Sequence, residues 1–81
     1  MNRTEALELV KDSISRVVPG ADLDALGPDD SFRDALEMDS LDFLAFIEAL
    51  SDRSGVRIED EDTQRLTTLS GTADFLVARA G

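Results

Sequence analysis

Residues Asp39–Leu50, with the sequence DSLDFLAFIEAL, predict one amphipathic helix. Asp39 can cap its first turn through the carboxylate, and Asp42 adds negative charge where the helix dipole favours it. At about 100° per residue, one face gathers apolar side chains that should meet a core: Phe43, Leu44, Phe46, Ile47 and Leu50. The opposite face carries Leu41, Asp42, Ala45, Glu48, Ala49 and Asp52. Gly55 lies just past the expected end of this helix.

The segment before this helix predicts another helix and then a long loop. Asn2 and Glu5 have the spacing of a capping box, and apolar residues then recur at three- and four-residue steps: Leu7, Val10, Ile14, Val17 and Val18. Pro19 and Gly20 should end this helix. Residues 20–39 show no sustained period, although apolar side chains stand among turn formers: Leu23, Leu26, Phe32 and Leu36. A loop of this length, anchored by apolar residues, is often functional.

The segment after Gly55 predicts a short helix and a last long one. The acids of Glu59–Asp62 suit the first turn of a helix over residues 59–66. The last helix should begin near Leu69 and place on one stripe Ala73, Leu76 and Ala80, with Phe75 beside it. The predicted fold is therefore all-α: a small four-helix bundle of three longer helices and one short helix, with a long loop between the first two. A chain of 81 residues has room for one domain, over residues 1–81.

The composition excludes most enzyme chemistry. The chain has no Cys and no His, which removes thiolate nucleophiles, imidazole triads and the zinc sites that depend on these residues. Asp22, Asp24 and Gly27 match the start of a calcium loop, but Leu26 and Arg33 stand where oxygen ligands are needed, so we expect no metal site. No apolar run approaches the roughly 20 residues of a membrane span, and no secretory signal opens the chain. We therefore expect a cytoplasmic protein that is not an enzyme.

The negative charge is concentrated in the middle of the chain. The net charge is −10, and residues 20–62 hold fourteen acids and three bases. This sign disfavours nucleic acid as a partner, because the phosphates of nucleic acid need a basic surface. A concentrated acidic field favours rapid, salt-sensitive encounter with basic proteins, although it also serves simply to keep a surface hydrated.

Ser40 is predicted to lie at the junction of the long loop and the second helix. Free backbone N–H groups and the positive end of the dipole would favour a phosphate on its hydroxyl there. Nothing nearby could turn this hydroxyl into a nucleophile unaided, since the chain has no histidine. The position suits a serine that another enzyme modifies, and the alternative is an ordinary serine beside a helix cap.

The residues from Asp30 onward, DSFRDALEMDSLDFL, resemble the acyl carrier protein family around its phosphopantetheine attachment serine. The resemblance covers nearly the whole chain, including the first helix, the acidic loop with Phe32, the turn at Ile58–Glu61 and the LTTL sequence of Leu66–Leu69. It implies a freestanding carrier in which a phosphopantetheinyl transferase, or carrier protein synthase, moves 4′-phosphopantetheine from coenzyme A onto Ser40. Acyl intermediates would then be held as thioesters on the imported thiol, in line with the absence of cysteine.

The resemblance also implies partners and a docking surface. The partner enzymes of the family recognise the helix after the serine, which here offers Asp39, Leu41, Asp42, Ala45, Glu48 and Asp52. The acids would steer basic surfaces of acyl-loading enzymes, ketosynthases or other biosynthetic enzymes, and the apolar residues would give a weak contact. We expect a monomer that binds neither nucleic acid nor membranes.

Two positions depart from the pattern of the family. Glu37, followed by the bulky Met38, stands where the family usually has glycine, so the geometry of the loop and the choice of transferase are open. Ala45 stands where many fatty-acid carriers have glutamate, which suggests a partner dedicated to one pathway.

The cargo and the pathway stay open from the sequence. Fatty-acid, polyketide and related secondary biosynthesis all use such carriers, and Leu44, Phe46, Ile47 and Val56 could line a space for an acyl chain or simply close the core. One alternative is an aminoacyl or peptidyl carrier, but those carriers commonly have paired glycines before the serine, and residues 36–38 contain none. Another is an acidic helical interaction module in which Ser40 is incidental or phosphorylated.

Overall fold

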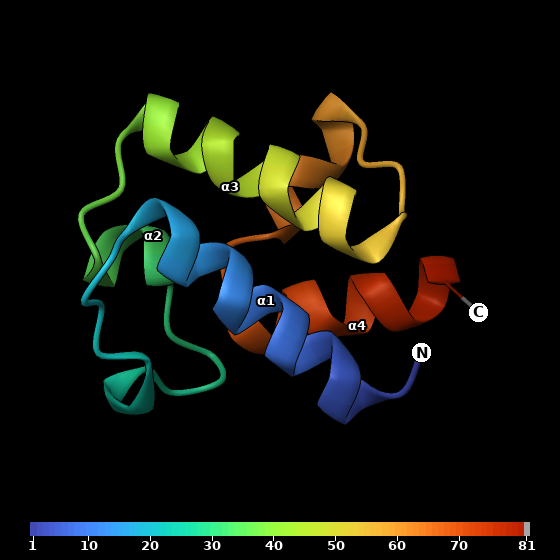
Figure 1. The fold of residues 1–81 in the computed structure, drawn as a ribbon, viewed down its shortest axis with the longest axis horizontal. Helices are drawn as coiled ribbons and strands as arrows, with labels where there is room; N and C mark the ends of the chain where they lie inside the picture. The colour runs from blue at the N-terminus through green and yellow to red at the C-terminus, as the bar shows by residue number, and fades with distance from the viewer. Residues whose placement is uncertain (81) are drawn as a thin grey trace.

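Three long helices pack around one core in the computed structural model, which describes residues 1–80 (Figure 1). The elements in chain order are α1 (Arg3–Val17), η1 (Leu23–Ala25), α2 (Phe32–Ala35), α3 (Ser40–Ser54), η2 (Asp60–Arg65) and α4 (Leu69–Ala80). Helix α1 contacts both α3 and α4, and the described chain contains no β-strand. The N-terminus and the end of α4 lie at one end of the molecule, and α3 begins at the other (Figure 1). The predicted all-α bundle is confirmed, with the short helix near residue 60 present as the 3₁₀ helix η2.

The helix ends follow the predicted caps. The Asn2 side chain accepts a hydrogen bond of 2.8 Å from the backbone N–H of Glu5 at the start of α1. At the start of α3, Asp39 Oδ1 accepts one of 2.8 Å from the N–H of Asp42. Helix α3 ends at Gly55, whose φ of 71° lies in the left-handed region that glycine adopts without strain. Local chemistry therefore sets where the two long helices around the site begin and where α3 ends.

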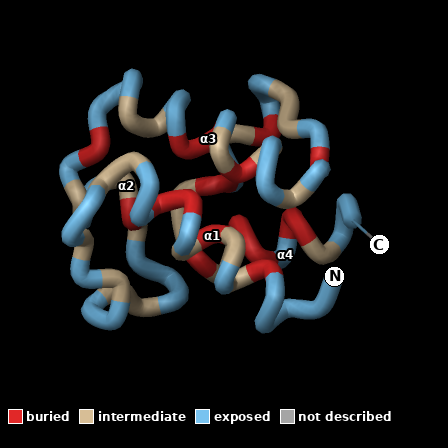
Figure 2. Tube along the Cα trace, in the orientation of Figure 1, coloured by how far each residue is buried: buried red, intermediate tan, exposed pale blue. Residues whose placement is uncertain are grey.

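The core is formed by buried faces of the three long helices together with side chains from the loops (Figure 2). Its buried apolar members are Ala6, Val10, Ile14, Phe32, Met38, Phe46, Ile47, Leu50, Val56, Leu66, Leu69, Ala73, Phe75 and Leu76. One residue that the periodicity placed in the core, Leu44, is exposed, so that prediction was wrong for it. Leu44 is 55% exposed because it lies at the margin of the apolar stripe of α3, beside a groove that the short η2 does not fill. Ala80 is exposed in the last turn of α4, at the end of the described chain.

The predicted loop between the first two long helices contains η1 and α2, so its description as unstructured was incomplete. Helix α2 spans only four residues and is capped by Ser31, whose Oγ accepts a hydrogen bond from the N–H of Asp34. The chain around α2 is tied to the segment before α4, because the N–H of Phe32 donates to the carbonyl of Thr67 at 2.9 Å. The Phe32 ring is fully buried and packs edge-on against Phe46, with 5.1 Å between centroids. This anchoring fixes the segment that leads to Ser40.

Candidate functional site

Ser40 is the first residue of α3 and is exposed to solvent. The Asp39 carboxylate is occupied by the N–H of Asp42, and within residues 1–80 the Ser40 hydroxyl makes no side-chain hydrogen bond. The N–H groups of Ser40 and Leu41 have no helix carbonyl to bind, because they belong to the first turn. An uncommitted hydroxyl at the positive end of a 15-residue helix has the space and the local field to carry a phosphate ester.

The segment before Ser40 is held by backbone hydrogen bonds and one buried side chain. The N–H of Met38 donates to the carbonyl of Arg33 at 2.9 Å, and the N–H of Leu36 donates to that of Phe32 at the same distance. The Met38 side chain is only 5% exposed. Ser40 is therefore presented by a fixed turn between α2 and α3 rather than by a free loop.

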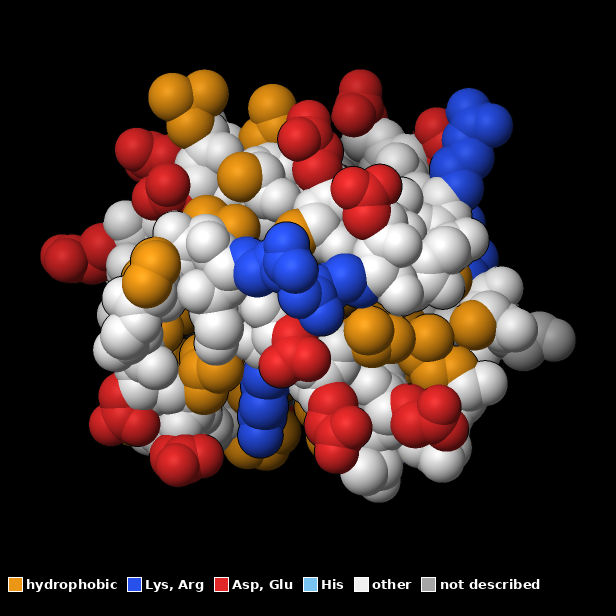
Figure 3. Space-filling view, viewed as in Figure 1, with side chains coloured by type: hydrophobic (Ala, Val, Ile, Leu, Met, Phe, Trp, Pro, Cys, Tyr) orange, Lys and Arg blue, Asp and Glu red, His pale blue; other side chains and the backbone are white. Residues whose placement is uncertain are grey.

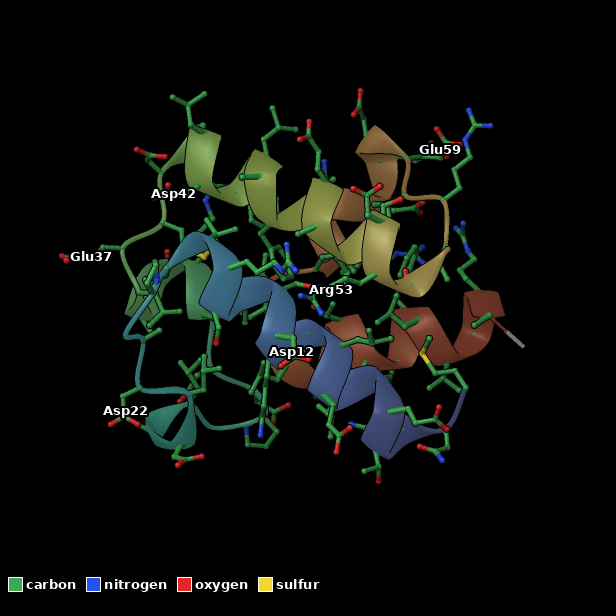
Figure 4. All side chains as sticks on the ribbon, viewed as in Figure 1. Asp12, Asp22, Glu37, Asp42, Arg53 and Glu59 are labelled. Atoms are coloured by element: carbon green, nitrogen blue, oxygen red, sulfur yellow. The ribbon has the colours of Figure 1, made fainter. Side chains whose placement is uncertain are left out.

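Glu37 adopts a left-handed backbone conformation, with a φ of 53°. It is the only residue other than glycine with positive φ in the described chain, and its side chain points away from the body of the molecule (Figure 4). This is the position where the resemblance places glycine, and the geometry explains why, since a Cβ is disfavoured in the left-handed region. Glu37 keeps the turn but holds it under strain.

Replacing Glu37 by glycine should therefore stabilise the protein. Relief of the left-handed strain favours the folded state by roughly 1–2 kcal/mol, and the greater freedom of glycine in the unfolded chain offsets about 0.4–1 kcal/mol of that gain. We expect Glu37→Gly to raise the free energy of unfolding by about 0.5–1 kcal/mol in urea titrations. The matched control is Glu48→Gly, which places glycine in the middle of α3 and should lower it by about 1 kcal/mol. A lower free energy of unfolding in both variants than in wild type would contradict the strain at Glu37.

A groove runs between α3 and η2, starting beside Ser40. Its first part has a volume of about 370 Å³ and is lined by Arg33, Ser40, Phe43, Leu44, Ile47, Asp60 and Thr63. A second part of similar volume continues along α3 and shares Leu44, Ile47 and Asp60 with the first. Of the four residues expected to line such a space, Leu44 and Ile47 do so, whereas Phe46 is fully buried in the core and Val56 lines a separate hollow near Arg79.

The expected docking residues share the solvent side of α3. Leu41 is 77% exposed, Asp42 is half-buried, and the others are exposed: Asp39, Ala45, Glu48 and Asp52. Figure 3 shows acidic and apolar side chains next to one another along the edge of the molecule that α3 forms, and Figure 4 marks Asp42 at its start. Asp39 differs from the rest because its carboxylate caps the helix. The sequence analysis missed Leu44 as part of this surface, since a leucine at the margin of an apolar stripe cannot be distinguished from a core residue by spacing alone.

Within residues 1–80, no three acidic side chains come together in a way that could hold a metal ion, and Asp22 points outward from the loop (Figure 4). None of the helices in this part of the chain combines the length and the apolar character that crossing a bilayer requires.

Comparisons with known proteins agree with the geometry. The family pattern described as a phosphopantetheine attachment site matches residues 8–76. An acyl carrier protein of Rubrobacter xylanophilus is 35% identical over 77 residues, which are 95% of this chain and 94% of that protein. One of Thermosynechococcus vestitus is 37% identical over 94% of this chain and 93% of its own length. One of Streptomyces coelicolor is 32% identical over 89% of this chain and 78% of its own length.

The fold and these matches define a carrier with a covalently attached 4′-phosphopantetheine, rather than an enzyme. The chain belongs to the acyl carrier protein family. This confirms the resemblance drawn from the sequence. Members of the family work with a phosphopantetheinyl transferase and with biosynthetic enzymes.

Proposed function

We propose that Ser40 carries the 4′-phosphopantetheine and that residues 1–81 act as one carrier domain for acyl intermediates. The observation that supports this most directly is the exposed, uncommitted hydroxyl of Ser40 at the start of α3, presented by an anchored turn. On modification, a bond forms between Ser40 Oγ and phosphorus while the bond to the nucleotide part of coenzyme A breaks. The hydroxyl proton passes to a base of the transferase, because this chain has no histidine and the Asp39 carboxylate beside Ser40 already accepts the N–H of Asp42. Once attached, the group supplies a flexible arm that ends in a thiol.

The absence of cysteine makes this proposal easy to test. The chain has no thiol of its own, so each attached arm adds the first and only one. After incubation with a broad-specificity transferase and coenzyme A, we expect one added phosphopantetheine by intact mass and one thiol per chain by thiol titration. Peptide mapping should place the added mass on the fragment that contains Ser40. An unchanged mass, or mass on another fragment, would contradict the proposal.

We also propose that the exposed face of α3 is where partner enzymes dock. Leu41 and Leu44 supply apolar contact area, and Asp42, Glu48 and Asp52 surround them with negative charge. Rim charges of this kind raise association rates and weaken in salt, and a small apolar centre allows release. The arrangement suits a partner with a basic rim, such as an acyl-loading enzyme or a ketosynthase.

Charge reversal on this face should weaken binding to such a partner. Asp42→Lys or Glu48→Lys is expected to reduce affinity about fivefold at low ionic strength, because an attraction of up to about 1 kcal/mol becomes a repulsion. The matched control is Glu8→Lys, an exposed acid of α1 on a different element. Binding by calorimetry at low and high salt is the measurement. An equal loss of affinity in Glu8→Lys and Asp42→Lys, or an affinity that does not depend on salt, would contradict docking on α3.

The groove beside Ser40 supports an acyl cargo. Phe43, Leu44 and Ile47 give it an apolar wall on the α3 side, which suits the hydrocarbon part of an intermediate of fatty-acid, polyketide or related biosynthesis. Loading by an acyl ligase should therefore exceed loading by an aminoacyl ligase. Preferential loading by the aminoacyl ligase would indicate an aminoacyl or peptidyl carrier instead.

A further inference from the structure

Arg33 is a cation that lies beside Ser40 and has no role in the proposed attachment reaction. It lies in α2 and lines the first part of the groove together with Ser40 and Phe43. Its guanidinium carbon is 4.8 Å from the centroid of the Phe43 ring, and the residue is half-buried. The contact with Phe43, at the start of α3, thus keeps the positive charge of Arg33 at the end of the groove where Ser40 lies.

Arg33 has no carboxylate partner within the described residues. The ion pairs there join Arg3 to Asp74, Arg53 to Asp12, Arg57 to Glu59 and Arg79 to Asp62. Residues 20–62 contain only three cations, and the other two, Arg53 and Arg57, are paired. In a segment with fourteen acids, the one cation without an acidic partner is therefore the one that shares a hollow with Ser40.

The contact with the Phe43 ring leaves the N–H donors of Arg33 available, since its side chain donates no hydrogen bond and forms no ion pair within residues 1–80. Contact with an aromatic ring uses the flat face of the group, whereas its N–H donors lie in the plane and match the oxygens of a phosphate. A phosphodiester on Ser40 would place a negative charge close to three carboxylates. Asp39 caps α3, Asp42 lies in its first turn, and Asp60 lines the groove. An arginine held there offsets this repulsion and can donate two parallel hydrogen bonds to the phosphate.

We infer that Arg33 binds the phosphate of the prosthetic group on Ser40 and so holds the root of the arm at the groove between α2, α3 and η2. This inference rests on the proposed function of Ser40. Arg33 is a positioning residue: it takes part in no bond making, and it sets where the arm leaves the protein. The competing explanation is that Arg33 only covers the Phe43 ring.

The test compares each variant with and without the arm. Wild type, Arg33→Gln, Arg33→Lys and Arg65→Gln are prepared in both forms, and the loaded forms are verified by intact mass. Arg65 is the matched control, because it is an exposed cation without an ion pair in the described chain and does not line the groove. The measurements are the change in melting temperature on loading and the ³¹P chemical shift of the single phosphorus.

The two explanations give different results. If Arg33 binds the phosphate, the change in melting temperature on loading should be about 2–4 °C less favourable in Arg33→Gln than in wild type, and this difference should shrink in 1 M salt. Arg33→Lys should restore part of it, and the ³¹P shift should move in Arg33→Gln but stay in place in Arg65→Gln.

Equal changes on loading in wild type and Arg33→Gln, with an unmoved ³¹P shift, would overturn the inference and leave Arg33 as a cover for Phe43. A wild type that gains no arm on Ser40 would overturn the proposed function as well, and the mass measurement separates these two failures.

Discussion

Ser40→Ala should abolish the gain of phosphopantetheine completely. The substitution removes the hydroxyl that forms the bond to phosphorus at the start of α3, and the other hydroxyl that lines the groove, that of Thr63, already donates to the carbonyl of Asp60. Loading should fall from one thiol per chain to none, measured by intact mass and thiol titration after the same incubation. The fold should survive, because Ser40 is exposed and alanine is a good helix former.

The control for this result is Ser15→Ala, which removes an exposed serine hydroxyl from α1. It should load as wild type does. Loading of Ser40→Ala to the level of wild type would show that another residue is the attachment site, whatever the geometry at α3.

Phe32→Ala should remove a large part of the stability of the domain. The ring is fully buried against Phe46, and truncating a buried phenylalanine costs about 3–5 kcal/mol in lost contacts and cavity formation. Domains of this size have a total stability of roughly 4–12 kcal/mol at the usual values per residue. The variant is expected to be marginally folded and to release the turn that presents Ser40.

Urea unfolding followed by far-ultraviolet circular dichroism is the suitable measurement, since the chain has neither tryptophan nor tyrosine to report by fluorescence. Leu41→Ala is the matched control: it truncates another large apolar residue, but one that is 77% exposed, and it should change the stability by less than about 0.5 kcal/mol. A loss below about 1 kcal/mol in Phe32→Ala would contradict the packing of the loop described above.

Much of the fold follows from local sequence signals. The caps at Asn2 and Asp39 each pair a side-chain acceptor with a backbone donor three residues on, so they are visible without any knowledge of tertiary structure. The spacing of apolar residues also located the three long helices, because a helical period is visible in the sequence alone. Helix α2 was not predicted, because four residues are too few to show a helical period. Ser31 and Asp34 nevertheless have the same capping spacing.

Features that depend on neighbouring elements could not be predicted. Whether Leu44 is buried depends on how far η2 reaches over α3, and spacing along one helix carries no such information. The left-handed turn at Glu37 is imposed by the anchored residues on both sides, so only the comparison with a glycine in the family pointed to it. The placement of Arg33 beside Ser40 likewise arises from the packing of α2 against α3.

The arrangement of the chain ends has a practical consequence for handling the protein. The N-terminus and the end of α4 lie at the side of the molecule opposite the start of α3 (Figure 1). An affinity tag, a fluorophore or a second protein fused to either terminus would leave the Ser40 end unobstructed. Immobilised on a sensor chip through such a tag, the domain would face the flowing solution with the end that enzymes need to reach.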